Sequence, residues 1–511
     1  MHIALPDSGE WSGQALKNYI GQTVVFDMPM IVCNNANGNY IVSPWRRFQP
    51  ESQGFAGSDE YNETVRINST CMFSLSGVSG YHRCGEKIYN LRAVVNSTSA
   101  LGMQSGTWRG NTRADLEAGL PDLGDYRLLV CCLNLENYFA EHIGSNYLGA
   151  DTYSEHQAQR AKVSKALRKI NADIYGLVEI EQGDVAIKEI IDDLNAGLPK
   201  RNYRYFHDAT VGSNQKTDFI YDANAVEPIG TPVETNVELQ YKKKMICFRE
   251  LGTGEKFIFS ANHFKSMNTG DEYRRVNEAK AVIKLYNSYR QNSNIREKDL
   301  LIMGDLNCYA KTEPIAAFTD NHLIDLHRAF HADSSYSYMF GGLASYIDHA
   351  ISNETLYRQI TGMAGYHINS DEDDYYTYDK SSDRTMFRCS DHDPVLVGLK
   401  LDSTLSQPIV PYFNNADMGK DSLSFYYVYT SNEEPVVYFD LYSINGMPIC
   451  PPTKIIYNGD IFERHTKYYT LKDQNDNLPE ELKRFLPLQP GLYVLRFYYN
   501  GTVTSHKLIV R

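Results

Sequence analysis

Apolar runs alternate with helical patterns between residues 128 and 399, and this alternation constrains the fold more than any other feature of the 511-residue chain. The run 128–133 is continuously apolar, as a strand buried on both faces requires. Farther along, Val163, Leu167 and Ile170 recur at the spacing of an amphipathic helix. Similar runs and stripes follow up to residue 399, and strands that alternate with helices predict an α/β domain.

The segments on either side of this region have β-rich patterns. Short strand-like runs separated by turn residues fill residues 1–122, which predicts a small all-β domain. Beyond a Pro-containing linker at 407–411, Asn-Gly dipeptides at 445–446 and 500–501 follow alternating apolar runs, and Asn-Gly is the strongest short hairpin signal. We therefore predict about three domains for a chain of this length. They are an all-β domain at 1–122, an α/β domain at 123–402 and a β-sandwich at 410–511.

Charge and composition narrow the class of protein. The formal net charge is −13, which argues against a protein that coats nucleic acid through counterion release, because such proteins are usually basic. It does not oppose a metal-dependent hydrolase, which gathers carboxylates to hold its cation. We expect no signal peptide within this sequence and no stable membrane insertion, because no run approaches the ~20 apolar residues of a membrane span. The nine cysteines include no C-x-x-C pair, and we interpret most of them as buried apolar residues.

Carboxylates and amides follow several of the apolar runs. Asp305 and Asn307 come directly after the run 300–303 and are separated by a single residue, so an extended chain would place both on one face. Glu179 ends another apolar run, where a carboxylate is either a surface residue or a ligand of a hard cation. Alone, each of these patterns is at least as common in turns and on surfaces as in active sites.

Two histidine motifs stand at similar places. His392 lies in Ser-Asp-His-Asp-Pro, residues 390–394, which opens the strand-like run 395–399, and His263 follows the run 257–261. Histidine is the usual proton carrier near neutral pH. The recurrence of Asp, Asn, Glu and His at strand ends predicts that they assemble into one site at the rim of a sheet.

One acidic segment falls outside this pattern. Residues 371–374 are all acidic and are followed by several tyrosines. We interpret the segment as a solvated loop, with a calcium site as the alternative.

The order N…E…NH-x-KS…GD-x-N…IDH…SDHDP over residues 126–401 resembles the endonuclease/exonuclease/phosphatase superfamily. That superfamily includes pancreatic-type deoxyribonuclease, abasic-site endonucleases, sphingomyelinases and inositol-polyphosphate phosphatases. The N-terminal region resembles the OB-like modules that precede such nucleases, and the C-terminal end resembles type IX secretion sorting domains. The segments that resemble the bacterial extracellular nuclease branch are 133–139, 176–181, 262–266, 336–338 with 347–349, and 388–394.

The resemblance implies a four-layer α/β/β/α sandwich flanked by the two β domains. It implies that Glu179 is the principal metal ligand, with Asn134 and Asp391 nearby. The cation would be Mg²⁺ or Mn²⁺, with Ca²⁺ as an alternative.

The resemblance also implies roles for the remaining residues. Asp305 and Asn307 would orient the attacking water and the scissile phosphate, and Asp348 would pair with His392. His263 would face the phosphate and help the leaving oxygen. The substrate-binding residues that it implies are Asn262 and Lys265.

One position departs from the deoxyribonuclease pattern. The acidic residue that orients the other histidine of the pattern, here His263, falls near Gln215 in this chain, and Asp218 stands on the opposite strand face. The partner of His263 is therefore left open.

These implications predict a nuclease that is secreted or displayed at the cell surface. It would cleave DNA, with RNA as a further substrate, by in-line attack of an activated water. Two alternatives stay open: a phosphomonoesterase or sphingomyelinase-like phospholipase of the same fold, and a catalytically inactive binding or surface protein. A membrane-acting phospholipase should present an exposed aromatic or basic hairpin beside its site. We expect a monomer without a protein partner.

Overall fold

The computed structural model divides the chain into two compact units, residues 1–321 with 325–403, and residues 322–324 with 404–511. The linker at 407–411 lies outside the described residues, and the boundaries of the three domains stay predictions. The structure describes residues 2–3, 13–44, 72–210, 212–235, 242–267, 270–292, 294–331, 334–402, 412–419, 422–428, 438–454, 491–499 and 502–510.

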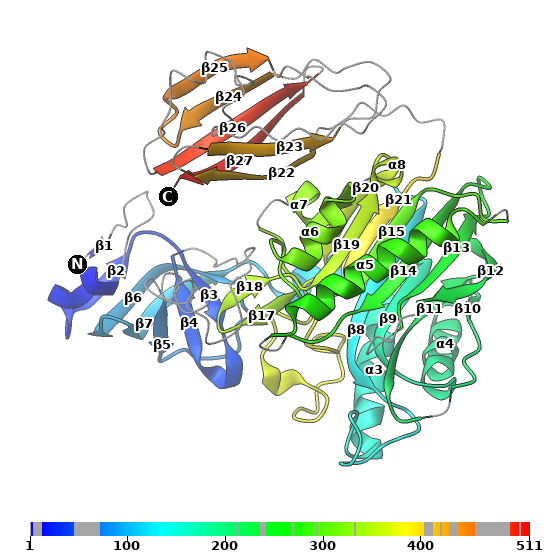
Figure 1. Ribbon diagram of the computed structural model, residues 1–511. Helices are drawn as coiled ribbons and strands as arrows, with labels where there is room; N and C mark the ends of the chain where they lie inside the picture. The colour runs from blue at the N-terminus through cyan, green and yellow to red at the C-terminus, as the bar shows by residue number, and fades with distance from the viewer. Residues whose placement is uncertain are drawn as a thin grey trace. The chain divides into compact units, whose positions relative to one another are not determined.

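Two six-stranded sheets form the centre of the α/β region (Figure 1). In the first sheet β8 and β9 are parallel, and in the second sheet β14 and β15 are parallel. The first sheet has the order β10 (Tyr203–Tyr205), β11 (Gln215–Asp222), β9 (Ile174–Glu181), β8 (Leu128–Tyr138), β21 (Val395–Leu399), β20 (Ile360–Gly365). The second has the order β12 (Val226–Glu234), β13 (Lys244–Glu250), β14 (Lys256–His263), β15 (Leu300–Asp305), β19 (Asp348–Asn353), β16 (Leu323–Asp325).

The two sheets pack face to face. The rings of Phe219 on β11 and Phe259 on β14 have centroids 5.4 Å apart. A Cβ on Gly176 of β9 would stand 3.0 Å from the Cβ of Ala261 on β14. Glycine therefore interrupts an otherwise apolar strand because the opposing sheet approaches too closely for a side chain.

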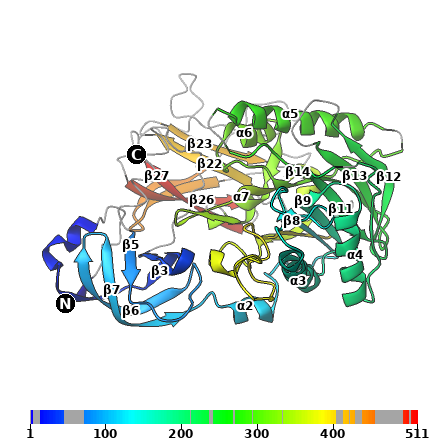
Figure 2. The same ribbon diagram turned by 90° about the horizontal axis from the view of Figure 1, so that it is seen from below.

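Helices cover the two outer faces (Figure 2). Leu167 and Ile187 join Leu133 of β8 in one hydrophobic cluster on the outside of the first sheet. On the other side, the Tyr289 hydroxyl accepts a hydrogen bond from the backbone N–H of Cys247 on β13, at 3.1 Å. The four-layer α/β/β/α sandwich is therefore confirmed. The helices are α3 (Tyr153–Ile170) and α4 (Val185–Gly197) on the first sheet, and α5 (Glu272–Tyr289) and α6 (Glu313–Thr319) on the second.

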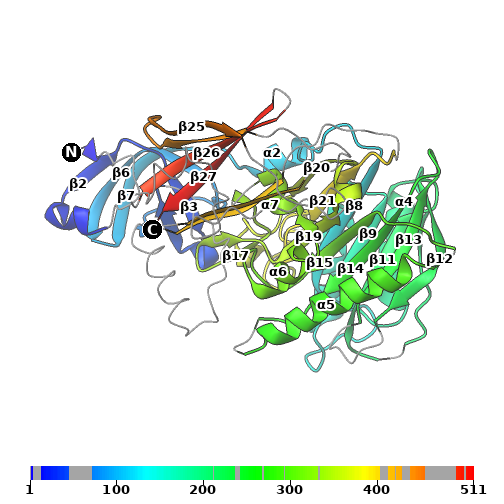
Figure 3. The same cartoon turned by 45° about the horizontal axis from the view of Figure 1, so that its top comes forward.

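The N-terminal region is a seven-stranded sheet, which confirms its β-rich pattern (Figure 3). We call it the N-terminal sheet. Alternate residues of its strands, such as Val24 and Phe26, are buried in one hydrophobic core. Its strands are β1 (His2–Ile3), β2 (Thr23–Phe26), β3 (Met30–Asn34), β4 (Tyr40–Ser43), β5 (Phe73–Ser76), β6 (Lys87–Ser97) and β7 (Ala100–Arg109).

The second unit is also built of strands. The hairpin expected at Asn445-Gly446 joins β24 (Tyr438–Ser443) to β25 (Pro448–Lys454), and Gly446 takes the positive φ of 77° that such a turn needs. The sheet has the order β25-β24-β26-β27, with β26 at Gly491–Tyr499 and β27 at Thr502–Val510, and β22 (Tyr412–Gly419) pairs with β23 (Ser422–Val428).

Residues 371–373 of the acidic segment are buried, and Glu372 contacts residues of the N-terminal region. The Glu372 carboxylate lies 2.5 Å from Arg83 Nε and 2.5 Å from Arg113 Nη2, and it accepts a hydrogen bond from the Tyr81 hydroxyl at 2.6 Å. The side chains of Arg83 and Glu372 are only 2% and 0% exposed. The interpretation of this segment as a solvated loop was therefore wrong, because arginines distant in sequence neutralise and cover it.

Replacing Glu372 by Ala should lower the free energy of unfolding by ~3–5 kcal/mol, because Arg83 then stays buried without its carboxylate. Urea denaturation of the full chain measures this difference. The matched control is Asp125→Ala, which removes an exposed carboxylate paired with Lys400 at 2.6 Å and should leave the curve unchanged. Equal curves for Glu372→Ala and the wild type would show that the buried pair contributes nothing.

Candidate active site

Three of the predicted residues form one row across the second sheet. The register of β14 with β15 places His263 opposite Asp305, and the register of β15 with β19 places Asp305 opposite Asp348. Because side chains alternate along a strand, His263 shares the face of Ala261, which packs against the first sheet. The row therefore faces the first sheet at the end of the space between the two sheets.

Three further residues reach this row from the first sheet. Asn134 of β8 stands beside Val178 in the parallel register, so Glu179 follows directly on β9, and His392 precedes β21 on the other side of β8. Asn134 Nδ2 donates to Asp305 Oδ2 at 3.1 Å and thereby links the two sheets.

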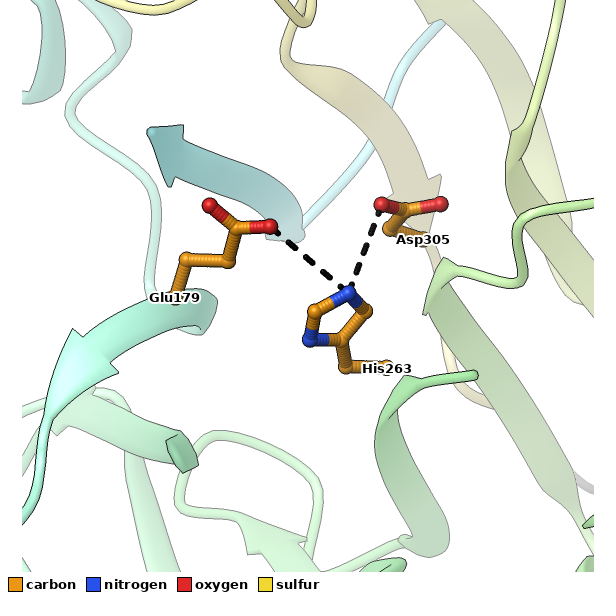
Figure 4. A group of neighbouring side chains, drawn as sticks. All are labelled: Glu179, His263 and Asp305. Carbon is orange, nitrogen blue, oxygen red and sulfur yellow. Dashed lines mark ion pairs between the residues drawn. The ribbon is translucent and has the colours of Figure 1, made fainter. Parts of the chain in front are cut away.

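The His263 ring lies between two carboxylates, one from each sheet (Figure 4). Its Nε2 is 3.7 Å from Glu179 Oε1 and 3.7 Å from Asp305 Oδ2. Burial, followed by the positive charges of Lys243, His392 and Lys265, holds the pKa of His263 well below its usual range. His263 is therefore neutral near pH 7 and can donate or accept one hydrogen bond at Nε2.

His392 and Asp348 form a hydrogen-bonded pair across the two sheets. His392 Nδ1 lies 2.8 Å from Asp348 Oδ2, which also accepts from the Ser337 hydroxyl at 2.7 Å. A carboxylate facing Nδ1 fixes the proton on that nitrogen. The other ring nitrogen, Nε2, faces Asp305, whose Oδ2 is 4.0 Å away. The pair joins the two sheets, because Asp348 opens β19 of the second sheet and His392 precedes β21 of the first.

Burial and the neighbouring charged groups shift the pKa values of this site in opposite directions. Burial lowers the pKa of His392, but the carboxylates of Asp348, Asp391 and Asp305 outweigh burial and hold the pKa well above its usual range. Burial raises the pKa of Asp305 to about 8; His392 acts against this rise, and Asp348 and Glu179 add to it. The site thus holds an imidazolium beside a carboxyl group whose pKa suits proton exchange near neutral pH.

Gly304 and Asn307 fix the position of the Asp305 side chain. Gly304 has a φ of +139°, and a Cβ there would stand 1.9 Å from the backbone oxygen of Asn262. Asn307 has a φ of +48°, its backbone N–H donates to Asp305 Oδ1 at 2.9 Å, and its Nδ2 donates to Oδ2 at 3.2 Å. Asp305 and Asn307 therefore meet through a turn after β15 and not, as the sequence suggested, through strand alternation.

Other residues with positive φ border the same site. Such backbone conformations are costly for residues other than glycine and gather where the surrounding structure holds a functional geometry. Among the described residues, those at the site are Glu136, Asn137, Glu179, Asn307 and Arg388.

The donor set fits a hard divalent cation. Glu179 Oε2 accepts from the backbone N–H of Asn137 at 3.1 Å, which fixes the carboxylate beside Asn134. One ligand atom each from Glu179, His263 and Asp305 lie within 4.8 Å of one another. Burial raises the pKa of Glu179, and a cation among these oxygens would offset the cost of burying their charge.

Asp391 and Lys265 lie at the rim of this site. The Asp391 side chain is 31% exposed, and its Oδ1 is 3.9 Å from His392 Nε2. The backbone N–H of Lys265 donates to the buried carboxylate of Glu278 on α5 at 2.8 Å, which fixes the segment after His263.

Asn262 is not brought to the site. It lies on the opposite face of β14 from His263 and is fully buried, and its Nδ2 donates to the backbone oxygens of Ser260 and Met303 at 3.2 and 3.3 Å. The expected contact of Asn262 with substrate was therefore wrong, because strand alternation sends it to the other side of the sheet.

The two candidate partners of His263 make other contacts. Gln215 Nε2 donates to Asn137 Oδ1 at 3.0 Å, and Asp218 Oδ2 lies 2.8 Å from Lys216 Nζ. The carboxylates beside the His263 ring are those of Glu179 and Asp305.

Sequence reasoning assigned no role to two residues of the site. The Ser337 hydroxyl donates to Asp348, and the ring of Tyr338 lies 5.0 Å from that of His392, centroid to centroid. Their signal in the sequence is the Tyr-Ser-Tyr motif at 336–338, for which the resemblance implies no function.

Several solved structures resemble the chain in part. A mannosyl-6-phosphatase from Bacteroides thetaiotaomicron is 18% identical, with a TM-score of 0.36, and the match covers 53% of this chain and 99% of that one. Truncated Caenorhabditis elegans TDP2 is 14% identical, with a TM-score of 0.38, over 54% and 97%. The human Nocturnin catalytic domain with bound sulfate is 13% identical, with a TM-score of 0.36, over 53% and 93%. No curated protein matches the sequence.

The sequence model of one protein family matches most of the sandwich. The match spans residues 145–392 and thus includes Glu179, His263, Asp305 and the pair of Asp348 with His392. That model is the one of the Endonuclease/Exonuclease/phosphatase family, and the α/β region of this chain matches it over residues 145–392.

Proposed function

We propose that the chain is a metal-dependent phosphodiesterase that cleaves nucleic acid, with DNA as the main substrate and RNA as a further one. The family consists of hydrolases of phosphoester bonds. The observation that carries the proposed metal-dependent hydrolysis is the row of His263, Asp305 and Asp348 facing Glu179 and His392 across the space between the sheets.

Three residues of the site have separate roles in the proposed in-line hydrolysis. Asp305, held by Asn134 and Asn307, orients the attacking water and accepts its proton as the water oxygen bonds to phosphorus. His392, kept as an imidazolium by Asp348, hydrogen-bonds a phosphate oxygen through Nε2. Neutral His263 hydrogen-bonds the leaving oxygen as its bond to phosphorus breaks.

Glu179 and Asn134 are the residues that would hold Mg²⁺ or Mn²⁺, with Asp305 close by and Asp391 at the rim. When bound there, such a cation neutralises negative charge on the phosphate, and Ca²⁺ is the alternative.

The nucleic-acid substrate and the extracellular location rest on resemblance. The segments from 133 to 394 that resemble bacterial extracellular nucleases support the substrate, and the likeness of the C-terminal end to type IX sorting domains supports a secreted or cell-surface location. Within the described residues no helix is both long and apolar enough to span a membrane.

One observation favours a lipid phosphodiesterase as the second candidate. A hairpin of β17 (Tyr338–Phe340) and β18 (Leu343–Ser345) lies beside His392, and its Phe340 is 54% exposed. However, a Cβ on Gly342 in its turn would meet Met72 at 2.5 Å, so one side of the turn packs against another part of the chain. A hairpin that inserts into a membrane needs a free turn. The exposed Phe340 therefore supports a lipid substrate less strongly than the resemblance to bacterial extracellular nucleases supports nucleic acid.

A substrate panel separates these candidates. We expect the full chain to cleave plasmid DNA, and RNA more weakly, with Mg²⁺ or Mn²⁺, and to lose this activity with a chelator. Sphingomyelin vesicles and an inositol phosphate are the parallel samples. Cleavage of sphingomyelin alone would assign the lipid function, and cleavage of none of the four with any cation would favour an inactive binding protein.

A further inference from the structure

The root of the β17–β18 hairpin is bonded directly to the catalytic pair. The Ser337 hydroxyl donates to Asp348 Oδ2, and the Ser337 backbone oxygen accepts from the backbone N–H of Asp393 at 2.8 Å. The next residue, Tyr338, places its largely buried ring against the imidazole of His392, with centroids 5.0 Å apart and planes 39° apart. The hairpin therefore contacts both members of the pair and the residue that follows His392.

The tip of the same hairpin is packed on the N-terminal sheet. Met339 packs against the hydrophobic core of that sheet. In the turn, Gly342 has a φ of +81°, and a Cβ there would stand 2.5 Å from Met72 Cε and 3.7 Å from the backbone oxygen of Cys33 on β3. The turn and the side chain of Met339 are thus held by residues outside the sandwich.

Strand alternation joins these two sets of contacts. Tyr338 and Met339 are adjacent on β17 and point to opposite faces. One face therefore lies on the catalytic imidazole while the other packs against the core of the N-terminal sheet, and a shift of that sheet would move the Tyr338 ring.

A second connection also reaches His392 through Asp393. Asp393 Oδ1 accepts from the backbone N–H groups of Asn369 and Ser370, each at 2.9 Å. These residues lead into the acidic segment, whose Glu372 pairs with the buried Arg83. Asp393 is thus tied to the N-terminal region by two routes, through the hairpin and through the acidic segment.

We propose that the N-terminal sheet is a positioning part of the active site, and that Tyr338 and Met339 are the positioning residues through which it sets the orientation of the His392 ring. The proposal rests on the proposed function, because it acts through His392. Neither residue needs to touch the substrate.

Loss of the Tyr338 ring should lower kcat more than it changes KM. A displacement of about 1 Å in a catalytic group can cost ~10²-fold in rate, so we expect Tyr338→Ala to reduce kcat by about 10- to 100-fold. Tyr338→Phe keeps the ring and should stay near the wild type. Met339→Ala should reduce kcat by about 3- to 10-fold, and Met339→Leu, which keeps the apolar volume, should restore it.

The test is a double-mutant cycle with His392→Ala in the full chain. Hydrolysis of bis(p-nitrophenyl) phosphate with Mn²⁺ gives kcat and KM for each variant. If both residues act through His392, Tyr338→Ala and Met339→Ala should have no further effect in the His392→Ala background. The matched control is Leu251→Ala, which truncates an exposed apolar residue in the turn between β13 and β14, away from His263, and should leave both constants unchanged.

A spectroscopic measurement makes the test independent of turnover. The imidazole ¹⁵N resonances of His392 should shift in Met339→Ala, although Met339 points away from that ring, and should not shift in Leu251→Ala. Unshifted resonances in a folded Met339→Ala variant would overturn the proposal even if no substrate is found. The proposal would also be overturned if Tyr338→Ala and Met339→Ala lowered kcat by the same factor in the wild type and in the His392→Ala background. A wild type that hydrolyses no phosphodiester but shows the shift would instead overturn the proposed function and leave the positioning role supported.

Discussion

Glu179→Gln should abolish metal-dependent hydrolysis, with a loss of ~10³-fold or more in kcat, while the chain keeps its fold. An amide has almost the volume of the carboxylate but lacks the negative charge that a hard cation requires, and the loss of a metal's charge stabilisation is worth several kcal/mol. The side chain accepts one backbone hydrogen bond, from Asn137, which an amide oxygen can also accept. Initial rates on plasmid DNA over a series of Mn²⁺ concentrations measure the effect.

Binding of the cation gives a second readout for this variant. Calorimetric titration with Mn²⁺ should show weakened binding in Glu179→Gln and unchanged binding in Glu227→Gln. Glu227 is the matched control because its half-exposed carboxylate lies on β12, paired with Arg249. Normal turnover of Glu179→Gln at low Mn²⁺ would remove Glu179 from the proposed ligands.

Removal of either member of the Asp348–His392 pair should lower kcat by ~10²–10⁴-fold, the range for a positioned acid–base group. Asp348→Asn removes the carboxylate that fixes the Nδ1 proton and that helps hold the pKa of His392 above its usual range. His392→Ala removes the imidazolium itself. Steady-state rates at saturating Mg²⁺ compare both variants with the wild type.

The double variant decides whether the two residues act as one unit. Residues that act together are strongly non-additive, so Asp348→Asn with His392→Ala should cost little more than the larger single loss. Two losses that simply multiply would mean that the residues act independently, and the 2.8 Å contact would then have only a structural role.

The elements of the sandwich could be predicted because their signals are local. The periodicity of Val163, Leu167 and Ile170 indicated a helix, and α3 covers all three. The apolar run 395–399 coincides with β21. The polar residues at strand ends could be found for the same reason, since a carboxylate or histidine after a buried strand is visible without knowing the strand's neighbours.

The sequence by itself therefore determined which strands and helices form and which polar residues stand at their ends. Only the tertiary structure decided which of them meet, because pairing register and the packing of the two sheets depend on contacts between distant residues. Asp348 of the second sheet contacts His392, which precedes a strand of the first sheet. Asn262 and His263 lie on opposite faces of the same strand. The tertiary structure also buried Glu372 against Arg83, 289 positions away, since a charged segment is solvated or covered according to whether its counter-charges fold onto it.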